Sequence, residues 1–553
     1  MNKHVAPLPA LLALALSAAI APAAAQTSAA AQAHVHDQSR LSPGEDPFKP
    51  VFIVTSRDTY DAGVKTLARN STGVQNGAGA KLVIAELKTH QLTDVTHHVH
   101  EKEKRCGGFV AFDSREEAEA FVRNDRTAQA MATQFATYTI DNQATVTPWL
   151  SQVAEANIRG TINHLSTSYP NRYYASTHGR TSATWIKDNW LSLANGRSDV
   201  SAELYTGCTT CSTQPSAILT IQGTDLPNEV VVLGAHLDSI SSTGSGDAMT
   251  APGADDDASG IATLTEVARI ALASGWKPKR TIKFMGYAAE EVGLRGSKAI
   301  ATDFKNRGVN VVGVLQLDMT NYRTSGTPEV RLVSDYSNSA LQQFLRDLHS
   351  TYLGGTLGSY TCGYGCSDHA SWTSAGFPAA IYFEGGNSSG GYFSSIHTPN
   401  DKLSNMGNSA TNSVPFAKLG LAFLGELGKT AGTGPGPGPG TQTYTNGADY
   451  AVNDNATVDS PITVSGRTGN APTSASVSVN IVHTYRGDLK VDLVAPDGSL
   501  YNISNRAGGS ADNVTGTFTF NLSSEPLNGT WKLRVNDNAS QDTGRIDTWS
   551  ITF

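Results

Sequence analysis

The run Glu229-Val-Val-Val-Leu-Gly-Ala235 leads directly into His236-Leu-Asp238. A short, mostly apolar run that does not alternate with polar residues is typical of a strand buried on both faces of a sheet. Thr281-Ile-Lys-Phe-Met-Gly-Tyr-Ala288 and Val311-Val-Gly-Val-Leu-Gln-Leu317 have the same character, and apolar residues between 261 and 272 follow helical spacing. Buried strands that alternate with helices predict an α/β sheet covered by helices on both faces.

Each of these three runs ends in residues that can bind a metal ion. His236 follows the first run, Glu290 and Glu291 follow the second, and Asp318 follows the third. In an open α/β sheet, ligands bind outside the carboxyl ends of the strands, so these side chains are expected at one edge. A solvated loop would explain one such residue but explains all of them poorly. Because imidazole and carboxylate groups suit several divalent cations, the sequence predicts metal-assisted hydrolysis.

Two more residues are candidates for the same edge. Asp238 is two residues from His236, which places both side chains on one face of a strand. A carboxylate there can accept the second N–H of a metal-bound imidazole; the alternative, a polar residue in a strand-end turn, carries about equal weight. His397 lies in a loop after the strand-like Ala379-Ala-Ile-Tyr-Phe383. A lone loop histidine is usually a surface residue, and His397 gains weight only because the site needs a second imidazole.

The segment Gly253-Ala-Asp-Asp-Asp-Ala-Ser-Gly260 places three adjacent aspartates ahead of a predicted helix. One of them is a candidate ligand, whereas the others can simply complement the positive end of the helix dipole. Spacing alone does not decide which aspartate faces the metals. Ser367-Asp368-His369 has the residue types of a catalytic triad, but adjacent residues do not form one by sequence proximity. No serine nucleophile and no phosphate-binding loop is predicted.

The chain has 553 residues, which predicts two or three folded units. Its net charge of −8 offers no basic surface for nucleic acid. Residues 1–25 are predicted to be a secretory signal peptide, with Lys3, an apolar stretch over 8–20 and the small residues Ala23-Ala-Ala25. The alternative, a membrane anchor, is disfavoured because this stretch is too short to span about 30 Å of hydrocarbon. The mature protein is therefore expected to be secreted, extracellular and free of the membrane.

Composition divides the remaining chain into four parts. Residues 26–142 predict a small α+β pro-segment, whose helix opens at the capping box Ser114-Arg-Glu-Glu117. Residues 143–430 carry the α/β pattern. A linker over 431–442 contains Gly434-Pro-Gly-Pro-Gly-Pro-Gly440, which cannot enter a core. Alternating apolar residues in 443–553 predict an all-β sandwich.

The cysteines form two closely spaced pairs, Cys208 with Cys211 and Cys362 with Cys366. In an exported protein such pairs indicate local disulfides. The alternative, a structural zinc site, is disfavoured by the export signal. Cys106, in the pro-segment, is left over, and the sequence assigns it no role.

The central part resembles the M28 family of zinc aminopeptidases, in particular its secreted bacterial leucyl aminopeptidases. Four motifs carry the likeness: Gly-Ala-His236-Leu-Asp238-Ser, Ala-Pro-Gly-Ala-Asp-Asp256-Asp-Ala-Ser-Gly, Tyr-Ala-Ala-Glu290-Glu291-Val-Gly-Leu-Arg-Gly-Ser and Leu-Gln-Leu-Asp318-Met-Thr-Asn-Tyr. The likeness extends from about residue 143 to residue 428. It implies the zinc-exopeptidase fold, a mixed sheet sandwiched by helices.

The resemblance also implies the site. His236 and Asp318 would hold one zinc, Glu291 and His397 the other, and Asp256 would bridge them. Glu290 would be the general base. The segment over 394–397 departs slightly from the family pattern. By the same likeness, residues 361–369 match a disulfide loop beside the substrate pocket, and the lining of an apolar pocket would be Met319, Tyr364, Ile381, Phe383 and Ile396.

The activity implied is the removal of N-terminal, leucine-like residues from peptides or protein N-termini by a monomer, with the pro-segment as inhibitor or chaperone. Val482-His-Thr-Tyr-Arg-Gly-Asp-Leu489, Val-Ala-Pro-Asp-Gly498 and Gly529-Thr-Trp531-Lys-Leu resemble the P domain (Homo B) of proprotein convertases, which implies a jelly-roll sandwich and leaves calcium binding open. Three alternatives stay in play. They are a carboxypeptidase or single-zinc aminoacyl cyclase on the same scaffold, a non-catalytic receptor with this fold, and a main role for the β-sandwich as a binding module.

Overall fold

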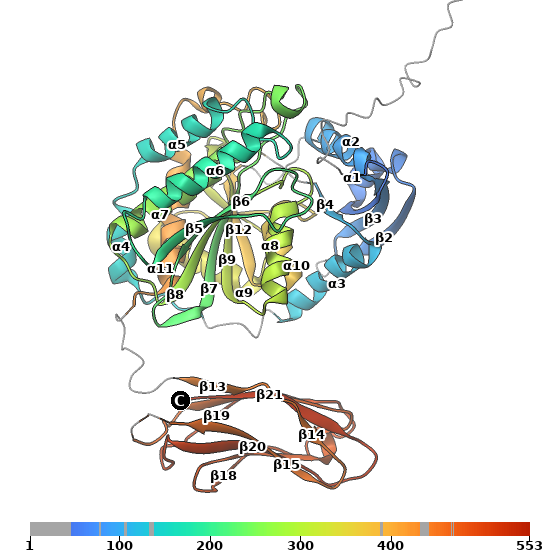
Figure 1. The fold of residues 1–553 in the computed structure, drawn as a ribbon, viewed down its shortest axis with the longest axis vertical. Helices are drawn as coiled ribbons and strands as arrows, with labels where there is room; N and C mark the ends of the chain where they lie inside the picture. Colours follow the sequence, from blue (N-terminus) through green and yellow to red (C-terminus); the bar gives the residue numbers. More distant parts are fainter. Residues whose placement is uncertain are drawn as a thin grey trace, which may run out of the picture.

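The structure, a computed structural model, describes residues 46–76, 79–103, 108–131, 138–386, 391–431, 442–465, 467 and 469–553. The predicted signal peptide, Cys106 and most of the predicted linker lie outside the described residues. Figure 1 shows an N-terminal α+β unit, a central sheet surrounded by helices, and a C-terminal β-sandwich. Within the described ranges, no helix is long and apolar enough to cross a membrane.

The central sheet has eight strands in the order β11-β10-β12-β9-β7-β8-β6-β5. Strands β12, β9, β7 and β8 run parallel to one another, and antiparallel strands flank them. The strands are β5 Val200–Tyr205, β6 Ser216–Ile221, β7 Leu226–His236, β8 Arg280–Tyr287, β9 Asn310–Arg323, β10 Val330–Val333, β11 Gly358–Tyr360 and β12 Ala379–Gly385. The sheet is therefore mixed, and the carboxyl ends of β7, β8 and β9 meet at one edge, as predicted.

Helices cover both faces of this sheet, and alternate residues of one strand show it. Val231 and Leu233 of β7 pack with the helices of one face, whereas Val230 and Val232 pack with those of the other. Residues from α4 Gln143–Leu150, α5 Glu155–Thr167, α6 Thr177–Ser192, α7 Ala258–Ala273, α9 Ser339–Tyr352 and α11 Val414–Gly428 belong to the first core. The second core contains residues of α8 Arg295–Asn306 and α10 His369–Ala375. Burial on both faces explains why β7 shows no polar alternation.

The N-terminal unit is a four-stranded sheet in the order β2-β3-β1-β4 together with helices. Its elements are β1 Pro50–Ser56, α1 Arg57–Ala62, β2 Asn70–Gln75, β3 Lys81–Lys88, α2 Leu92–His97, β4 Phe109–Phe112 and α3 Arg115–Met131. Ser114 caps α3 by accepting the N–H of Glu117, which is half of the predicted capping box. The side chain of Glu117 accepts the N–H of Asp113 instead of that of Ser114.

The C-terminal unit is a sandwich of two antiparallel sheets, β13-β21-β16-β19 with β14 added to β21, and β15-β20-β17-β18. The strands are β13 Thr443–Asn446, β14 Tyr450–Val452, β15 Thr457–Val464, β16 Ala475–His483, β17 Leu489–Val494, β18 Leu500–Asn505, β19 Val514–Phe520, β20 Gly529–Asp537 and β21 Gly544–Thr552. Inward-facing residues of both sheets form one core. The predicted turn at Asp497-Gly498 joins β17 to β18.

Candidate metal centre and active site

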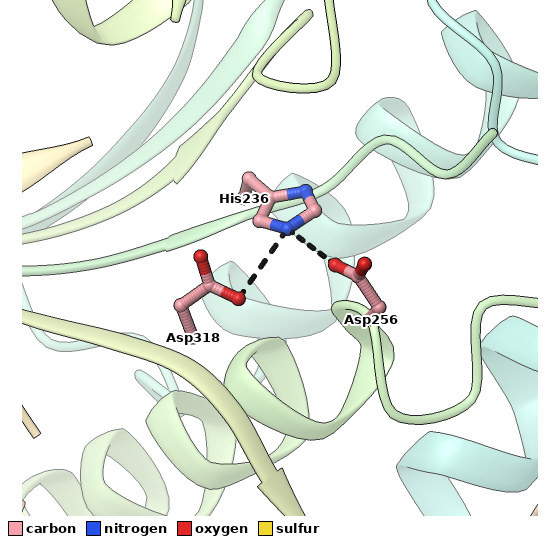
Figure 2. A group of neighbouring side chains, drawn as sticks. All are labelled: His236, Asp256 and Asp318. Atoms are coloured by element: carbon pink, nitrogen blue, oxygen red, sulfur yellow. Dashed lines mark hydrogen bonds and ion pairs between the residues drawn. The ribbon is translucent and has the colours of Figure 1, made fainter. Parts of the chain in front are cut away.

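The sheet edge brings the predicted strand-end residues together in a buried cluster. His236 is the last residue of β7, Glu290 and Glu291 follow β8, and Asp318 lies within β9. All four are almost completely buried. Figure 2 shows His236, Asp256 and Asp318 converging from separate segments, with Asp256 reaching in from the turn before α7.

Asp256 lies between the two imidazoles. One of its carboxylate oxygens is 2.9 Å from Nε2 of His236, and the other is 2.8 Å from Nε2 of His397. His236 Nε2 is also 3.7 Å from Oδ1 of Asp318, and His397 Nε2 is 3.2 Å from Oε2 of Glu291. The donor atoms of His236, Asp256 and Asp318 lie within 4.8 Å of one another, as do those of Asp256, Glu291 and His397. We call these the strand triad and the loop triad.

The neighbouring aspartates have other partners. Asp257 caps α7 by accepting the N–H of Gly260, and it also accepts the N–H groups of His236 and Met319. Asp255 accepts the N–H of Asn321. Sequence spacing left open which of the three aspartates faces the imidazoles, and in the structure that residue is Asp256.

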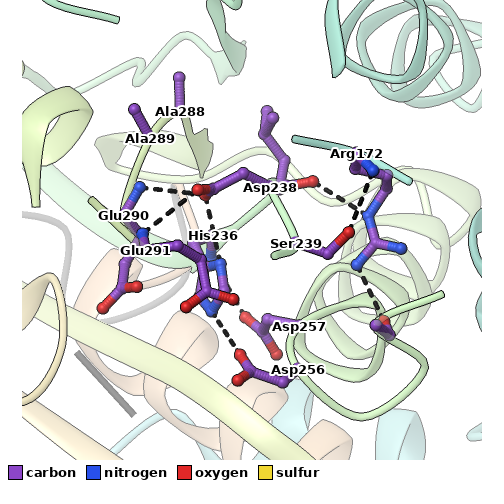
Figure 3. Close-up of polar contacts among 12 residues, drawn as sticks. Arg172, His236, Asp238, Ser239, Asp256, Asp257, Ala288, Ala289, Glu290 and Glu291 are labelled. Atoms are coloured by element: carbon purple, nitrogen blue, oxygen red, sulfur yellow. Dashed lines mark hydrogen bonds and ion pairs between the residues drawn. The ribbon is translucent and has the colours of Figure 1, made fainter. Parts of the chain in front are cut away.

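Asp238 connects the strand triad to the turn that carries both glutamates. Its Oδ1 is 3.4 Å from Nδ1 of His236, on the side of the ring away from Asp256. The same carboxylate accepts the backbone N–H groups of Glu290 (3.0 Å) and Glu291 (3.2 Å), as Figure 3 shows. A carboxylate in this position fixes the orientation of an imidazole and also fixes the backbone of the glutamate pair.

Several buried polar atoms of the described residues at this edge make no hydrogen bond. Among the residues that the structure describes, neither carboxylate oxygen of Glu290 has a hydrogen-bond partner, nor does Oδ1 of Asp318. A buried polar atom left unsatisfied costs about 1–3 kcal/mol, and a charged one costs more. A site with this excess of buried carboxylate therefore fits bound cations, and the mixture of imidazole and carboxylate donors fits zinc.

The close packing of acids and imidazoles shifts their protonation. Burial raises the pKa of Glu290 well above its usual value, and the neighbouring Glu291 adds to this. Burial and the charge of Asp256 raise the pKa of Glu291 to about 7. Although burial opposes it, the carboxylates of Glu291 and Asp256 raise the pKa of His397 to about 10. Without cations, protons thus occupy the centre.

Comparison of the sequence with known proteins assigns the chain to a family. The family description "Peptidase family M28" matches residues 217–420, and "Proprotein convertase P-domain" matches residues 472–553. Leupeptin-inactivating enzyme 1 of Streptomyces exfoliatus is 36% identical over 422 residues, which cover 72% of this chain and 90% of that protein. The chain belongs to peptidase family M28.

Further relatives agree with this assignment. Leucine aminopeptidase 1 of Phaeosphaeria nodorum is 36% identical over 296 residues, covering 51% of this chain and 73% of that protein. The crystal structure of the LapA aminopeptidase of Legionella pneumophila is similar with a TM-score of 0.57 and 29% identity, covering 69% of this chain and 99% of that one. The M28 chain is an aminopeptidase that carries a C-terminal P domain.

Beside the strand triad of this aminopeptidase lies a narrow apolar cavity of about 10 Å³. Of the five residues predicted to line a pocket, Tyr364, Ile381 and Phe383 line the cavity. Met319 and Ile396 pack in the same apolar cluster but do not line it. Cys362, Cys366 and Ser367, from the loop predicted to lie beside the pocket, also line it, as does the predicted ligand Asp318. The lining residues Tyr360 and Tyr392 were not predicted. Both predicted disulfides, Cys208–Cys211 and Cys362–Cys366, are present, and the second borders the cavity.

Sequence reasoning also missed two buried charged residues that contact the turn carrying Asp256. Arg172, ahead of α6, is fully buried, and its guanidinium donates to backbone carbonyl groups on several segments. Asp401, four residues after His397, accepts backbone N–H groups of the turn. Neither lies at a strand end or in a ligand-like pattern, so the sequence contained no signal for them.

Proposed function

We propose that this M28 aminopeptidase removes leucine-like N-terminal residues from peptides through a centre that binds two zinc ions. The observation that carries the proposal is the carboxylate of Asp256, whose two oxygens face one imidazole each. A shared carboxylate lets two neighbouring cations use one aspartate. The strand triad would hold one ion and the loop triad the other.

Bound zinc would supply Lewis acidity that polarises a peptide carbonyl and lowers the pKa of an attacking water. Glu290 would accept the proton of that water and deliver it to the leaving nitrogen. Its unpaired carboxylate and its raised pKa suit a group that takes and returns a proton. Asp238 would hold this base beside its metal-binding neighbour, because it accepts the backbone N–H groups of both Glu290 and Glu291.

The preference for an apolar first residue rests on the cavity beside Asp318. Ile381 and Phe383 of β12 form one wall, and Tyr364 and the disulfide between residues 362 and 366 form another. These walls are apolar or aromatic, so a leucyl side chain would lose little by leaving water. At about 10 Å³ the cavity holds no more than a water molecule, so its walls must move apart to admit a leucyl side chain.

We further propose that residues 46–131 act as a restraining pro-segment of an exported precursor. Ala111 of β4 donates its N–H to the carbonyl of Gly293, just after the glutamate pair. Phe121 of α3 stacks on Tyr336 with ring centroids 5.2 Å apart. Val110 and Phe121 also lie close to Gly365, inside the disulfide loop that borders the cavity. These contacts press the loop against the cavity from outside and would keep it narrow.

The experiment that tests the proposed function is hydrolysis of leucine p-nitroanilide by the purified mature form. We expect activity that chelation abolishes and added zinc restores. An amino-blocked leucine substrate should not react, which separates an aminopeptidase from a carboxypeptidase or an aminoacyl cyclase. Activity that survives exhaustive chelation would contradict the metal centre. Extracellular location, a monomeric state and calcium binding by residues 443–553 stay predictions.

A further inference from the structure

The turn over residues 252–257, which we call the bridging turn, carries Asp256 between the two triads. Because Asp256 belongs to both triads, the position of the bridging turn determines where the Asp256 carboxylate lies between His236 and His397. The turn contacts the guanidinium of Arg172 and the carboxyl group of Asp401, and both residues are almost completely buried. Neither belongs to the strand triad or the loop triad.

Arg172 binds the carbonyl groups of the bridging turn. Its Nη1 donates to the carbonyl of Pro252 at 2.6 Å, and its Nη2 donates to the carbonyl of Gly253 at 2.8 Å. Its Nε donates to the carbonyl of Leu237 at 3.0 Å, and Leu237 lies between His236 and Asp238. Figure 3 shows this guanidinium on the side of the bridging turn away from the glutamates. The planar fork therefore ties the turn to the strand triad.

Asp401 binds the amide groups of the same turn. Its two carboxylate oxygens accept the N–H of Asp255 at 2.8 Å and the N–H of Asp256 at 3.1 Å. Its backbone carbonyl accepts the N–H of Ala254 at 3.1 Å. Since Asp401 ends the loop that carries His397, these bonds tie the turn to the loop triad.

We propose that Arg172 and Asp401 are positioning residues that jointly fix Asp256 between the two triads, and so set the affinity of the centre for both cations. The inference rests on the proposed two-metal function. The two side chains bind different groups of the turn. Arg172 donates to its carbonyl groups, and Asp401 accepts from its amide N–H groups. Two hydrogen bonds from the charged guanidinium, which are of the stronger kind, hold one side of the turn, and two hydrogen bonds to the side chain of Asp401 hold the other.

The test measures zinc affinity of the full chain, not activity. Each variant is stripped of metal and titrated with zinc against a chromogenic chelator. Asp401→Asn keeps the shape of the side chain but replaces one acceptor oxygen with an amide group. Arg172→Lys keeps the charge but loses the fork. We expect each to weaken zinc binding about 10–100-fold, the range for groups that orient metal ligands.

Matched controls separate positioning from general stability. Asp335 accepts two backbone N–H groups, those of Cys362 (2.6 Å) and Gly363 (3.2 Å), away from both triads. Arg280, at the opposite end of β8, donates to the carbonyl of Leu427 at 2.8 Å and pairs with Glu229. Asp335→Asn and Arg280→Lys should lower the melting temperature of the zinc-free chain as the test variants do. Their zinc affinity should stay within about threefold of wild type, well below the 10–100-fold loss expected for positioning groups.

Four results would count against the inference. Unchanged zinc affinity in both Asp401→Asn and Arg172→Lys would remove the positioning role, and so would an equal loss in the controls. An Arg172→Lys chain that does not fold would show that Arg172 serves the fold itself and would remove its half. A wild-type chain that binds no zinc would instead overturn the proposed function, and this inference with it.

Discussion

His236 and Asp318 of the strand triad extend from neighbouring parallel strands, whereas Glu291 and His397 of the loop triad lie in loops. The sheet fixes the first pair through the register of β7 and β9. Glu291 instead donates its backbone N–H to Asp238, and Asp256, which both triads share, donates its backbone N–H to Asp401. His397 itself has a left-handed backbone, with φ of 56°. One half of the centre thus follows from the fold, while the other half is held by added contacts.

The largest effect is expected from Glu290→Gln, which tests proton transfer separately from metal binding by the two triads. The variant loses the group that moves the proton, so kcat should fall by at least about 10²–10⁴-fold. Both triads stay complete, so zinc affinity should stay unchanged. The measurement is kcat on leucine p-nitroanilide beside zinc content after dialysis. Near-normal turnover by the zinc-loaded variant would remove Glu290 from the role of base.

A direct comparison of the halves comes from His236→Ala and His397→Ala. Each removes one imidazole that would bind zinc directly. The affinity for the zinc ion at that triad should therefore fall by more than about 100-fold, the upper end of the loss for a group that only orients a ligand. We expect His397→Ala to keep one tightly bound zinc, because the strand triad is held by the sheet. His236→Ala should keep its remaining zinc less tightly. Equal affinity of the remaining ion in the two variants, from chelator competition, would show that the strand and loop triads do not differ.

Asp238→Asn tests the contact that joins the halves. The amide can still receive one backbone N–H but no longer offers two charged oxygens to His236 and the glutamate turn. We expect zinc affinity to fall about 10–100-fold at both ions. Asp335→Asn serves as the control. A loss confined to one ion would mean that Asp238 supports only the imidazole or only the turn.

The pH dependence of zinc binding should also differ between the triads. Although burial opposes it, the surrounding carboxylates raise the pKa of His236 well above its usual value and that of His397 to about 10, so in the metal-free protein each triad holds an imidazole proton that zinc must displace. Affinity should therefore rise about tenfold per pH unit between pH 7 and pH 10. Below the pKa of Glu291, about 7, a second proton must leave and the dependence steepens. On acidification the ion of the loop triad should leave first, which chelator competition across pH measures.

The sequence predicted the sheet and the strand triad because both follow from one pattern. Apolar runs mark buried strands, and a polar residue at the end of such a run must lie at the edge of the sheet. His236 and Asp318 needed no other information. The same reasoning placed Glu291 near the site, since the glutamate pair directly follows β8.

The remaining parts of the site depend on tertiary contacts that leave no local pattern. Asp256 differs from its two neighbours only in the direction its side chain takes. Left-handed backbone at Ala289, Met319 and His397 sets the direction of nearby side chains, and such strain persists only where surrounding contacts impose it. The tie between Arg172 and the bridging turn joins segments about 80 residues apart in the chain. Propensity and periodicity carry none of this.

The substrate cavity also combines a strand and a loop, because β12 supplies one wall and the disulfide loop the other. Ile381→Ala should leave a lasting space in the strand wall, since neighbouring strands hold the backbone on both sides. We expect the preference for leucine over phenylalanine p-nitroanilide to change about tenfold in favour of phenylalanine, within the range that pocket contacts supply. Tyr364→Ala removes a side chain from the loop wall, which can collapse into the space, so the change should be smaller. Ile282→Ala, a core deletion in β8, should leave the preference unchanged. A larger change in Tyr364→Ala than in Ile381→Ala would show that the loop wall, and not the strand wall, sets the size of the cavity.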